Sequence, residues 1–199
     1  MRVDWHAIEL TRTVGWEERD RSDDDLSDYE GLVAWSVGRG IVSREEGDAL
    51  REQARQRPTQ AAAALEDARS LRSLVYHLFS AVARGDPPDP ERLSDLTAWV
   101  HRFLPARRLR PGDSGATWAW RLDPYRLDHV LGPVAHSAAE LLTSPEVERL
   151  RLCDGDGCGW LFVDASRSRS RRWCDMSDCG NRTKVRRFRA RRLLDQGPP

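Results

Sequence analysis

The sequence predicts a mainly α-helical protein. A helical N-terminal domain, residues 1–149, is followed by a small module, residues 150–192, that contains a β-hairpin and a basic helix. Apolar residues recur at helical spacing over most of the first segment. All four cysteines, and most of the unbalanced positive charge, fall within the second segment. Residues 193–199 are expected to form a flexible tail.

The composition excludes several classes of protein. The chain has 199 residues, 39% of them hydrophobic, and its mean hydropathy is −0.66, which suits one soluble core with a small appended module. No uncharged apolar run approaches the roughly 18 residues of a membrane helix. The first residues, 1–6, lack the apolar stretch of a secretory signal. A cytoplasmic protein without a membrane partner is therefore expected.

Two sequence patterns mark the starts of helices in the N-terminal domain. Ser27-Asp28-Tyr29-Glu30 and Ser43-Arg44-Glu45-Glu46 both fit the capping box, in which Ser and Glu satisfy each other's backbone N–H groups. A long helix is predicted from Thr59 to about Arg84, ending before Gly85. Apolar residues between Leu93 and Phe103 mark another helix.

The end of this domain is predicted to be less regular. Residues 104–116 contain two prolines and two glycines and are predicted to be a loop. Residues 117–122 are predicted to form a strand of a small hairpin, with Trp118 and Trp120 on one side. Residues 124–143 form the last predicted helix, kinked at Gly132-Pro133 because proline lacks a backbone donor.

The N-terminal domain shows no catalytic motif. It contains no HExxH, P-loop, GxSxG or GxGxxG pattern, and none of its histidines stands at metal-ligand spacing. His129 and His136 could share a helix face, but a structural role is favoured for both. Trp118 and Trp120 could line a small-molecule pocket, although core packing explains them more simply. We therefore expect that the protein is not an enzyme.

The cysteines show the spacing of a metal site. Cys153, Cys158, Cys174 and Cys179 follow the pattern C-x4-C-x15-C-x4-C, in which two close pairs can surround one tetrahedral Zn(II). Glycines between the first two cysteines permit a sharp turn. Disulfides are disfavoured without a secretion signal, and a redox-active pair usually shows C-x2-C. One structural zinc ion is the predicted cofactor.

The elements around the cysteines follow the order of a treble-clef-like zinc finger. Residues 160–163 are predicted to form a strand, and residues 171–174 to return antiparallel to it after a loop at 166–170. Asn181 is predicted to cap a helix that runs to about Arg192. Val185 and Phe188, three residues apart, are expected to face the zinc hairpin.

The charge of the chain is segregated. Residues 1–150 contain 20 basic and 26 acidic side chains, whereas residues 151–199 contain 12 basic and 6 acidic ones. A basic segment of this kind suggests an anionic partner, most often nucleic acid, although a solvated basic tail is the alternative. No acidic residue lies between Asp178 and Asp195, so the helix cations are expected to lack local partners. The candidate DNA-binding residues are Arg167, Arg169, Arg171, Arg172, Arg182, Lys184, Arg186, Arg187 and Arg189.

Within this segment, Cys179-Gly180-Asn181-Arg182 follows an Arg-Arg-Trp-Cys sequence, and Leu161-Phe162-Val163-Asp164 follows the first two cysteines. These residues resemble the CGNR zinc finger, over about residues 150–192. In that family the finger usually follows a helical ABATE domain, which residues 1–149 resemble less closely. Where that domain often has Leu-Asp-Phe-x-Asn-Thr, this chain has Ile8-Glu9-Leu10-Thr11-Arg12-Thr13. The resemblance implies a bacterial, stress-induced regulator of transcription.

A zinc-dependent, DNA-binding transcriptional regulator is the function that these observations predict. The finger helix would contact double-stranded DNA, and the helical domain would sense a small-molecule effector or form a homodimer. Arg182 and Arg186 are predicted to read bases, since they lie in the first turns of the helix. Two alternatives stay open: an RNA- or ribosome-binding zinc module, and a thiol redox sensor that releases zinc.

Overall fold

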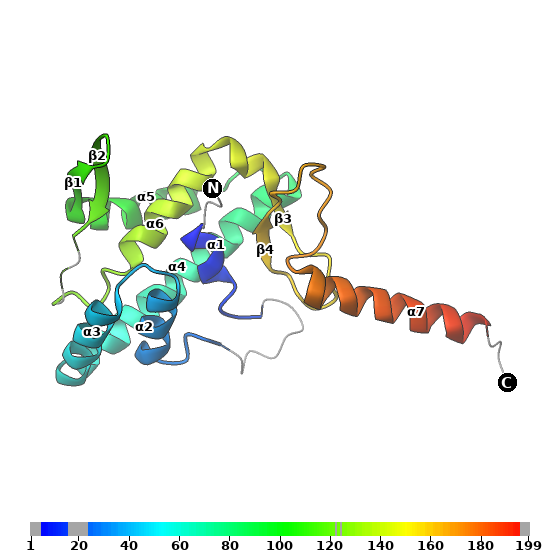
Figure 1. Cartoon of the computed structure of the whole chain (residues 1–199), viewed down its shortest axis with the longest axis horizontal. Coiled ribbons are helices and arrows are strands. Elements are labelled where there is room, and N and C mark those ends of the chain that lie inside the picture. Colours follow the sequence, from blue (N-terminus) through cyan, green and yellow to red (C-terminus); the bar gives the residue numbers. More distant parts are fainter. Residues whose placement is uncertain (1–4, 16–23, 122, 124, 196–199) are drawn as a thin grey trace.

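The computed structural model describes residues 5–15, 24–121, 123 and 125–195. The chain is mainly helical, as the sequence predicted, with two small antiparallel sheets (Figure 1). The α-helices are α1 (His6–Thr11), α2 (Tyr29–Gly38), α3 (Arg44–Gln56), α4 (Pro58–Arg84), α5 (Pro90–Phe103), α6 (Leu131–Thr143) and α7 (Asn181–Asp195). The strands are β1 (Arg107–Gly112), β2 (Gly115–Trp120), β3 (Leu150–Leu152) and β4 (Leu161–Val163). Short helical turns are η2 (Leu104–Ala106), η3 (Pro145–Arg149) and η4 (Met176–Gly180).

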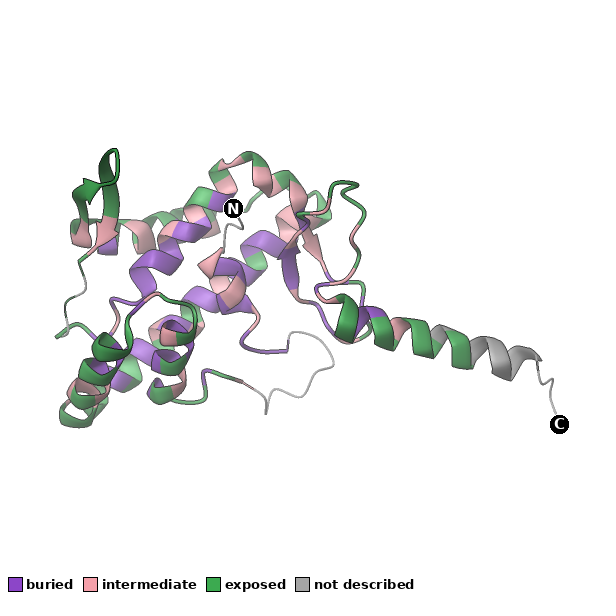
Figure 2. Ribbon diagram, viewed as in Figure 1, coloured by how far each residue is buried: buried purple, intermediate pink, exposed green. Residues whose placement is uncertain are grey.

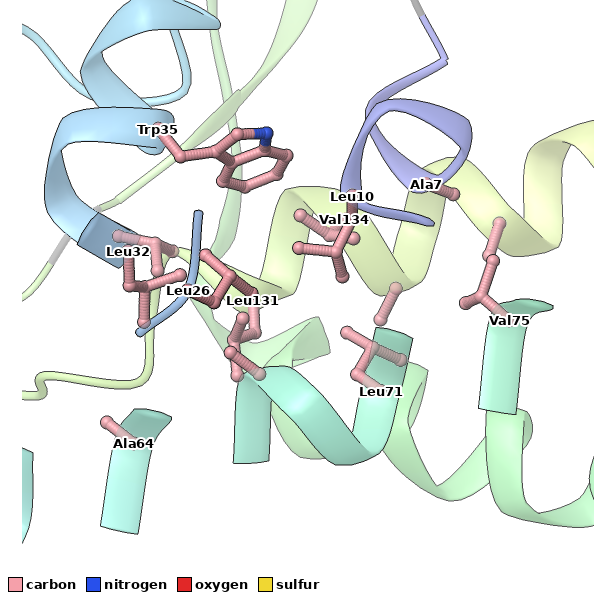
Figure 3. Packing of buried hydrophobic residues seen from close by; sticks show 14 of the residues in the cluster. Ala7, Leu10, Leu26, Leu32, Trp35, Ala64, Leu71, Val75, Leu131 and Val134 are labelled. Atoms are coloured by element: carbon pink, nitrogen blue, oxygen red, sulfur yellow. The ribbon is translucent and has the colours of Figure 1, made fainter. Parts of the chain in front are cut away.

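Helix α4 lies at the centre of the core. It packs against α1, α2, α5, α6 and the β3–β4 hairpin. Leu71, Val75 and Phe79 follow one another at intervals of four residues, so they share one face of the helix, and all three are fully buried. Figure 3 shows Leu71 and Val75 beneath side chains of α1 and α6. The helix ends at Gly85, whose φ of +89° suits a left-handed cap. Among the described residues, no helix is both long enough and apolar enough to cross a membrane.

One of the two predicted capping boxes is confirmed. The Ser43 hydroxyl accepts a hydrogen bond of 3.1 Å from the Glu46 N–H, and the Glu46 carboxylate accepts one of 2.6 Å from the Ser43 N–H. The box at Ser27 is wrong. Helix α2 begins at Tyr29, and the Asp28 carboxylate caps it by accepting 2.8 Å from the Gly31 N–H. Asp caps a helix as well as Ser does, so the helix begins one residue later than the predicted box would place it.

The hairpin predicted around Trp118 is confirmed, but the loop predicted at 104–116 is wrong. Strand β1 occupies residues 107–112 and pairs with β2, with Arg107 opposite Trp120 and Gly112 opposite Gly115. A two-residue turn joins the strands, and Gly115 adopts a φ of +107°, which favours glycine. The β1–β2 ribbon stands on one side of the molecule and is exposed over most of its length (Figures 1 and 2).

The last helix of the domain begins later than predicted and is not kinked at proline. Helix α6 starts at Leu131, so Pro133 lies in its first turn, where no N–H is needed. Gly132 allows a close approach, because a Cβ there would come within 3.0 Å of Phe103 and 3.1 Å of the Trp120 ring. The base of the ribbon therefore packs tightly on α5 and α6.

The hairpin of the C-terminal module differs from the prediction. Strand β4 pairs with β3, placing Leu150 opposite Val163 and Leu152 opposite Leu161, and not with residues 171–174. Backbone groups of residues 171–174 are used elsewhere: the Arg172 carbonyl accepts 2.9 Å from the Asp154 N–H. Leu150 and Leu161 are buried in the same apolar core as the helical domain.

Helix α7 extends away from the body of the molecule (Figure 1). It runs to Asp195, beyond the end predicted at Arg192, so three residues of the predicted tail are helical. The other four, residues 196–199, lie outside the described residues. Asn181 does not cap the helix, because η4 precedes it directly and Asn181 already has helical dihedral angles.

Candidate zinc site and nucleic-acid interface

The four cysteines meet at one point. Cys153 follows β3, Cys158 precedes β4, Cys174 follows the loop after β4, and Cys179 lies in η4. All four are buried free thiols, and their sulfur atoms lie within 4.8 Å of one another. The Cys174 sulfur is 3.7 Å from those of Cys158 and Cys179. A Zn–S bond of about 2.3 Å implies tetrahedral S–S edges of roughly 3.8 Å, so the cluster fits one zinc ion.

Hydrogen-bond donors surround the sulfur atoms. The backbone N–H groups of Gly155 and Cys174 lie 3.4 and 3.3 Å from the Cys153 sulfur, and the Arg182 guanidinium lies 3.2 Å from that of Cys179. Hydrogen bonds from Cys158 and Cys174 lower the pKa of Cys153, and hydrogen bonding to Cys153 and Cys158 raises the pKa of Cys174. Four thiols this close cannot all ionise without a cation, and Zn(II) supplies that charge.

A glycine makes the turn between the first two cysteines possible. A Cβ added to Gly155 would lie 3.0 Å from the Cys179 Cβ and 3.1 Å from its sulfur. The backbone of the segment between Cys153 and Cys158, called the knuckle below, therefore lies directly on the cysteine cluster. Gly157 and Gly159 adopt φ values of +64° and +61°, which lets the chain turn back into β4.

Aromatic side chains connect the cysteine cluster to the helical domain. Phe162 is buried against the cysteines, and Trp160 and Trp173 pack on the same cluster. The Trp160 indole N–H donates a hydrogen bond of 2.9 Å to the Val14 carbonyl. The Arg12 guanidinium lies 5.0 Å from the centre of the Trp160 ring. The module is thus attached to the segment that follows α1.

Asp164 organises the loop after β4, a role that the sequence reasoning missed. Its carboxylate is fully buried and accepts hydrogen bonds of 2.8 Å from the Ser166 N–H and 2.9 Å from the Arg171 N–H. Burial raises the pKa of Asp164, but the hydrogen bonds outweigh burial and leave the pKa below its usual value. A lone acidic residue directly after an apolar strand was the available signal.

Asp175 plays a similar role at the start of η4. Its carboxylate accepts 2.6 Å from the Ser177 N–H and 3.2 Å from the Asp178 N–H. Hydrogen bonds from Ser177 and Asp178 hold the pKa of Asp175 below its usual value. The turn that carries Cys179 into α7 is therefore capped by a carboxylate, not by Asn181.

The expectation that the helix cations lack local partners is wrong for Arg182 and Arg186, and Arg172, which lies before the helix, is paired as well. Arg172 lies 2.7 Å from Asp154, Arg182 lies 3.0 Å from Asp178, and Arg186 forms an ion pair with Asp156. Two of these acids stand in the knuckle between Cys153 and Cys158. All three arginines are exposed, so these ion pairs face solvent and are individually weak.

Two further candidates are occupied within the protein. Arg171 is half-buried, donates 2.7 Å to the Trp173 carbonyl, also bonds the Cys174 carbonyl, and stacks over the Phe162 ring at 5.1 Å. Its role is therefore to hold the loop beside the cysteines. Arg169 lies 3.9 Å from Glu148 and has a φ of +51°.

The remaining candidates differ in what surrounds them. Arg167, Lys184 and Arg189 are exposed and form no ion pair with any residue that the structure describes. The side chain of Arg187 lies outside the described residues. Val185 and Phe188 are 48% and 60% exposed and do not join the buried cluster around the cysteines, but Val185 lies on the side of α7 that faces the knuckle, as predicted. A groove of about 440 Å³ lies between the knuckle and α7, lined by Asp156, Arg182, Val185, Arg186 and Arg189.

Fold and site together define a helical protein with a C-terminal four-cysteine zinc finger. Comparison with known families matches residues 6–145 to ABATE, described as "Putative stress-induced transcription regulator", and residues 149–192 to the CGNR zinc finger. The chain belongs to the ABATE family of these transcription regulators and ends in a CGNR zinc finger. None of the curated proteins matches the chain at a significant level.

Proposed function

We propose that the protein is a DNA-binding transcription regulator whose C-terminal finger grips duplex DNA. Cys153, Cys158, Cys174 and Cys179 hold one structural zinc ion. Four protein ligands complete a tetrahedral shell and leave no position for a substrate, which supports a binding role and not an enzymatic one. The observation that supports this proposal best is the exposed basic helix α7, which starts at the metal cluster and extends away from the body (Figure 2).

The construction of α7 suits insertion into a groove. An isolated 15-residue helix is marginally stable in water, but here η4 and Cys179 anchor its first turn. The DNA major groove is about 12 Å wide and admits one helix. Lys184 and Arg189 are exposed on α7, and Arg167 lies in the loop after β4. Arginine and lysine at such positions bind phosphates, and arginine can also read guanine.

The ion pairs set limits on the strength of this contact. Arg167, Lys184 and Arg189 alone would displace three counterions, for a slope of log K against log salt of about −2.7, at roughly −0.9 per phosphate. If Arg172, Arg182 and Arg186 exchange their carboxylate partners for phosphates, the slope steepens to about −5.4. The measured slope therefore reports whether these three pairs open on DNA.

A salt titration of duplex binding tests the proposal. Fluorescence anisotropy is measured for the wild type, Lys184→Ala and Arg189→Ala. Each variant should weaken binding and reduce the slope by about one. Arg110→Ala is the matched control, because Arg110 is an exposed arginine on the β1–β2 ribbon. A flat salt dependence, or an equal loss in the control, would contradict the proposed interface.

The same measurement separates the alternatives. Tighter binding to an RNA duplex or to ribosomal RNA than to DNA would favour the hypothesis of an RNA- or ribosome-binding module. For the redox reading, zinc release by mild oxidant with loss of DNA binding is the expected observation. Burial of all four thiols slows such oxidation, so the redox-sensor hypothesis has less support than the RNA-binding hypothesis.

A sensing role for the helical domain is supported by a cleft at its junction with the finger. The cleft measures about 610 Å³, within the usual range for small-molecule sites. Both parts of the chain line it, with Glu9, Arg12, Arg39, Arg149, Phe162 and Arg171 among the side chains. Glu9 already pairs with Arg12 and Arg39, at 3.1 and 3.0 Å. Arg149 is half-buried and forms no ion pair with another described residue, so a small anionic effector fits best.

Binding of inorganic phosphate and of succinate tests this part of the proposal. Either anion should raise the melting temperature of the wild type by mass action, and the Arg149→Ala variant should lose the effect. Arg110→Ala again serves as the control. No shift with either anion, or the same shift in all three proteins, would remove the support for an anionic effector.

A further inference from the structure

The β1–β2 ribbon exposes a face that a small soluble domain normally buries. On one side of the ribbon Leu109 stands opposite Trp118, and these side chains are 61% and 55% exposed. On the other side Arg108 stands opposite Ala119, and Arg110 opposite Thr117. The ribbon is therefore amphipathic, although the Arg107 guanidinium lies over the Trp118 ring on the apolar side, 4.8 Å from the ring centre. A two-stranded ribbon of this kind is marginally stable in water and gains from a further strand.

The two free edges of the ribbon are not equivalent. The Arg121 N–H donates 2.8 Å to the Ala106 carbonyl, and hydrogen-bonded pairs alternate with non-hydrogen-bonded pairs along an antiparallel ladder. With the observed register, the backbone groups that point outward from β1 belong to Arg107, Leu109 and Pro111. Pro111 has no N–H, so the β1 edge is incomplete.

The outer edge of β2 is complete. The outward backbone groups there belong to Ala116, Trp118 and Trp120, and each of these residues has both an N–H and a carbonyl. Ala116 and Trp118 are also exposed. Unprotected edges of this kind are templates for pairing with another strand.

We propose that a second copy of this chain pairs with the β2 edge through its own β2, forming a four-stranded antiparallel sheet across a twofold axis. Trp118 lies on the axis and pairs with Trp118 of the second copy, and Ala116 pairs with Trp120 in both directions. This register uses every outward donor and acceptor of the three residues. Isologous pairing of this sort closes at two copies. The inference does not depend on DNA binding.

The side chains fit this register on both faces. On the apolar face the two Trp118 rings stand next to each other, flanked by Leu109 from each copy, and such aromatic pairs stabilise sheets. On the other face Thr117 stands opposite Ala119 of the second copy. These small residues separate Arg108 and Arg110 from the arginines across the axis, so like charges do not meet directly.

The size of the contact predicts a weak dimer. Two short strands and four large side chains bury less than the roughly 1,200 Å² at which stable interfaces begin. We therefore expect a reversible dimer whose population follows protein concentration.

Sedimentation equilibrium of the full, zinc-loaded chain tests the proposal. Ala116→Pro removes one outward N–H but no bond within the ribbon, and Trp118→Lys places like charges on the axis. Each should raise the dimer dissociation constant at least about tenfold. The matched control is Ser114→Lys, which adds the same charge at the exposed turn of the ribbon, outside the paired residues 116–120, and should leave the dissociation constant nearly unchanged. Far-ultraviolet circular dichroism verifies that each variant is folded.

A comparison of two cysteine variants by disulfide cross-linking tests the same contact independently of the variants above. Hydrogen-bonded cross-strand partners have Cα atoms about 5.5 Å apart, within the range of a disulfide. Trp118→Cys should thus form an intermolecular disulfide under mild oxidation, whereas Ala119→Cys, which faces Thr117, should not. A wild type that is monomeric at every concentration would overturn the proposal, and so would equal cross-linking of both cysteine variants.

Discussion

The indole N–H of Trp160 donates a 2.9 Å hydrogen bond to the main-chain carbonyl of Val14, which joins two residues 146 positions apart. Trp160 belongs to the zinc finger and Val14 follows the first helix of the bundle. Arg12 reinforces the contact, with its guanidinium 5.0 Å from the Trp160 ring centre. The finger is therefore fixed to the helical domain by a polar contact in addition to its apolar strands.

Loss of this hydrogen bond should destabilise the whole protein. Trp160→Phe leaves the buried Val14 carbonyl without its donor, and we expect a decrease of about 1–3 kcal/mol in the free energy of unfolding, measured in urea. Trp173→Phe is the matched control. The buried Trp173 indole N–H has no hydrogen-bond partner within the described residues, so its loss should cost less. Equal decreases in the two variants would contradict the role assigned to Trp160.

Removal of one zinc ligand should affect more than the finger. Elemental analysis of the wild type should give one zinc per chain, and Cys174→Ser should lose it. The helices should persist in circular dichroism, because most of the core lies in the bundle. The melting temperature should nevertheless fall, since Leu150 and Leu161 join that core from the finger hairpin. An unchanged melting temperature would show that the hairpin stays packed without metal.

Neutralising a knuckle acid should strengthen DNA binding. Asp156 forms an ion pair with Arg186, and both side chains are exposed. Asp156→Asn frees the guanidinium for a phosphate and removes a repulsive charge, so affinity should rise and the salt slope should steepen by up to about one. Asp113→Asn, at the turn of the ribbon, is the control. Unchanged affinity in Asp156→Asn would place this side of α7 away from DNA.

Acid should lower the free energy of unfolding of the helical domain by protonating Asp24, which pairs with Arg72. Arg72 is 6% exposed and bonds Asp24 at 2.5 and 2.7 Å. Burial raises the pKa of Asp24, but the Arg72 hydrogen bond and charge outweigh burial and hold the pKa below its usual value. A carboxyl group whose pKa is lower in the folded protein than in the unfolded chain stabilises the fold at pH values above the unfolded-state pKa. This stabilisation is lost as the pH falls through the folded-state pKa.

The measurement is the urea midpoint of the wild type and of Asp24→Asn as a function of pH. At neutral pH the substitution should cost about 2 kcal/mol, less than a fully buried pair because Asp24 is partly exposed. The difference between the two proteins should shrink below about pH 4, the ordinary range of an Asp carboxyl. A difference that is constant with pH would mean that Asp24 does not titrate against Arg72.

Features with local causes could be predicted from the sequence. Helix α4 was predictable because its apolar residues repeat at helical spacing over 27 residues, and the Ser43 capping box because it depends on only four consecutive residues. The cysteine cluster was predictable because one metal ion demands four ligands at close spacing. Strand β3 has three residues, too few for a pattern, and its pairing with β4 depends on burial against α4. Strand β1 contains two arginines and a proline between its ends, a composition typical of loops.

The candidate interface shows the same division. The charge of the basic segment was readable, but the partners of its arginines were not, because Asp154 and Asp156 lie 18 and 30 residues from Arg172 and Arg186. Only the folded knuckle brings these groups together. Asn181 looked like a helix cap because caps are judged from neighbouring residues, whereas the π-helical turn before it takes its cap from Asp175.

The position of the β3–β4 hairpin has a kinetic consequence. Cys153 follows β3 directly and Cys158 stands three residues before β4, while Leu150 and Leu161 are buried against the central helix. Any opening of the bundle that withdraws these leucines also displaces two thiolates. Transfer of zinc to a competing chelator should then act as a timer for that opening, and truncation of a remote core side chain such as Leu71 should shorten the lifetime of the bound metal.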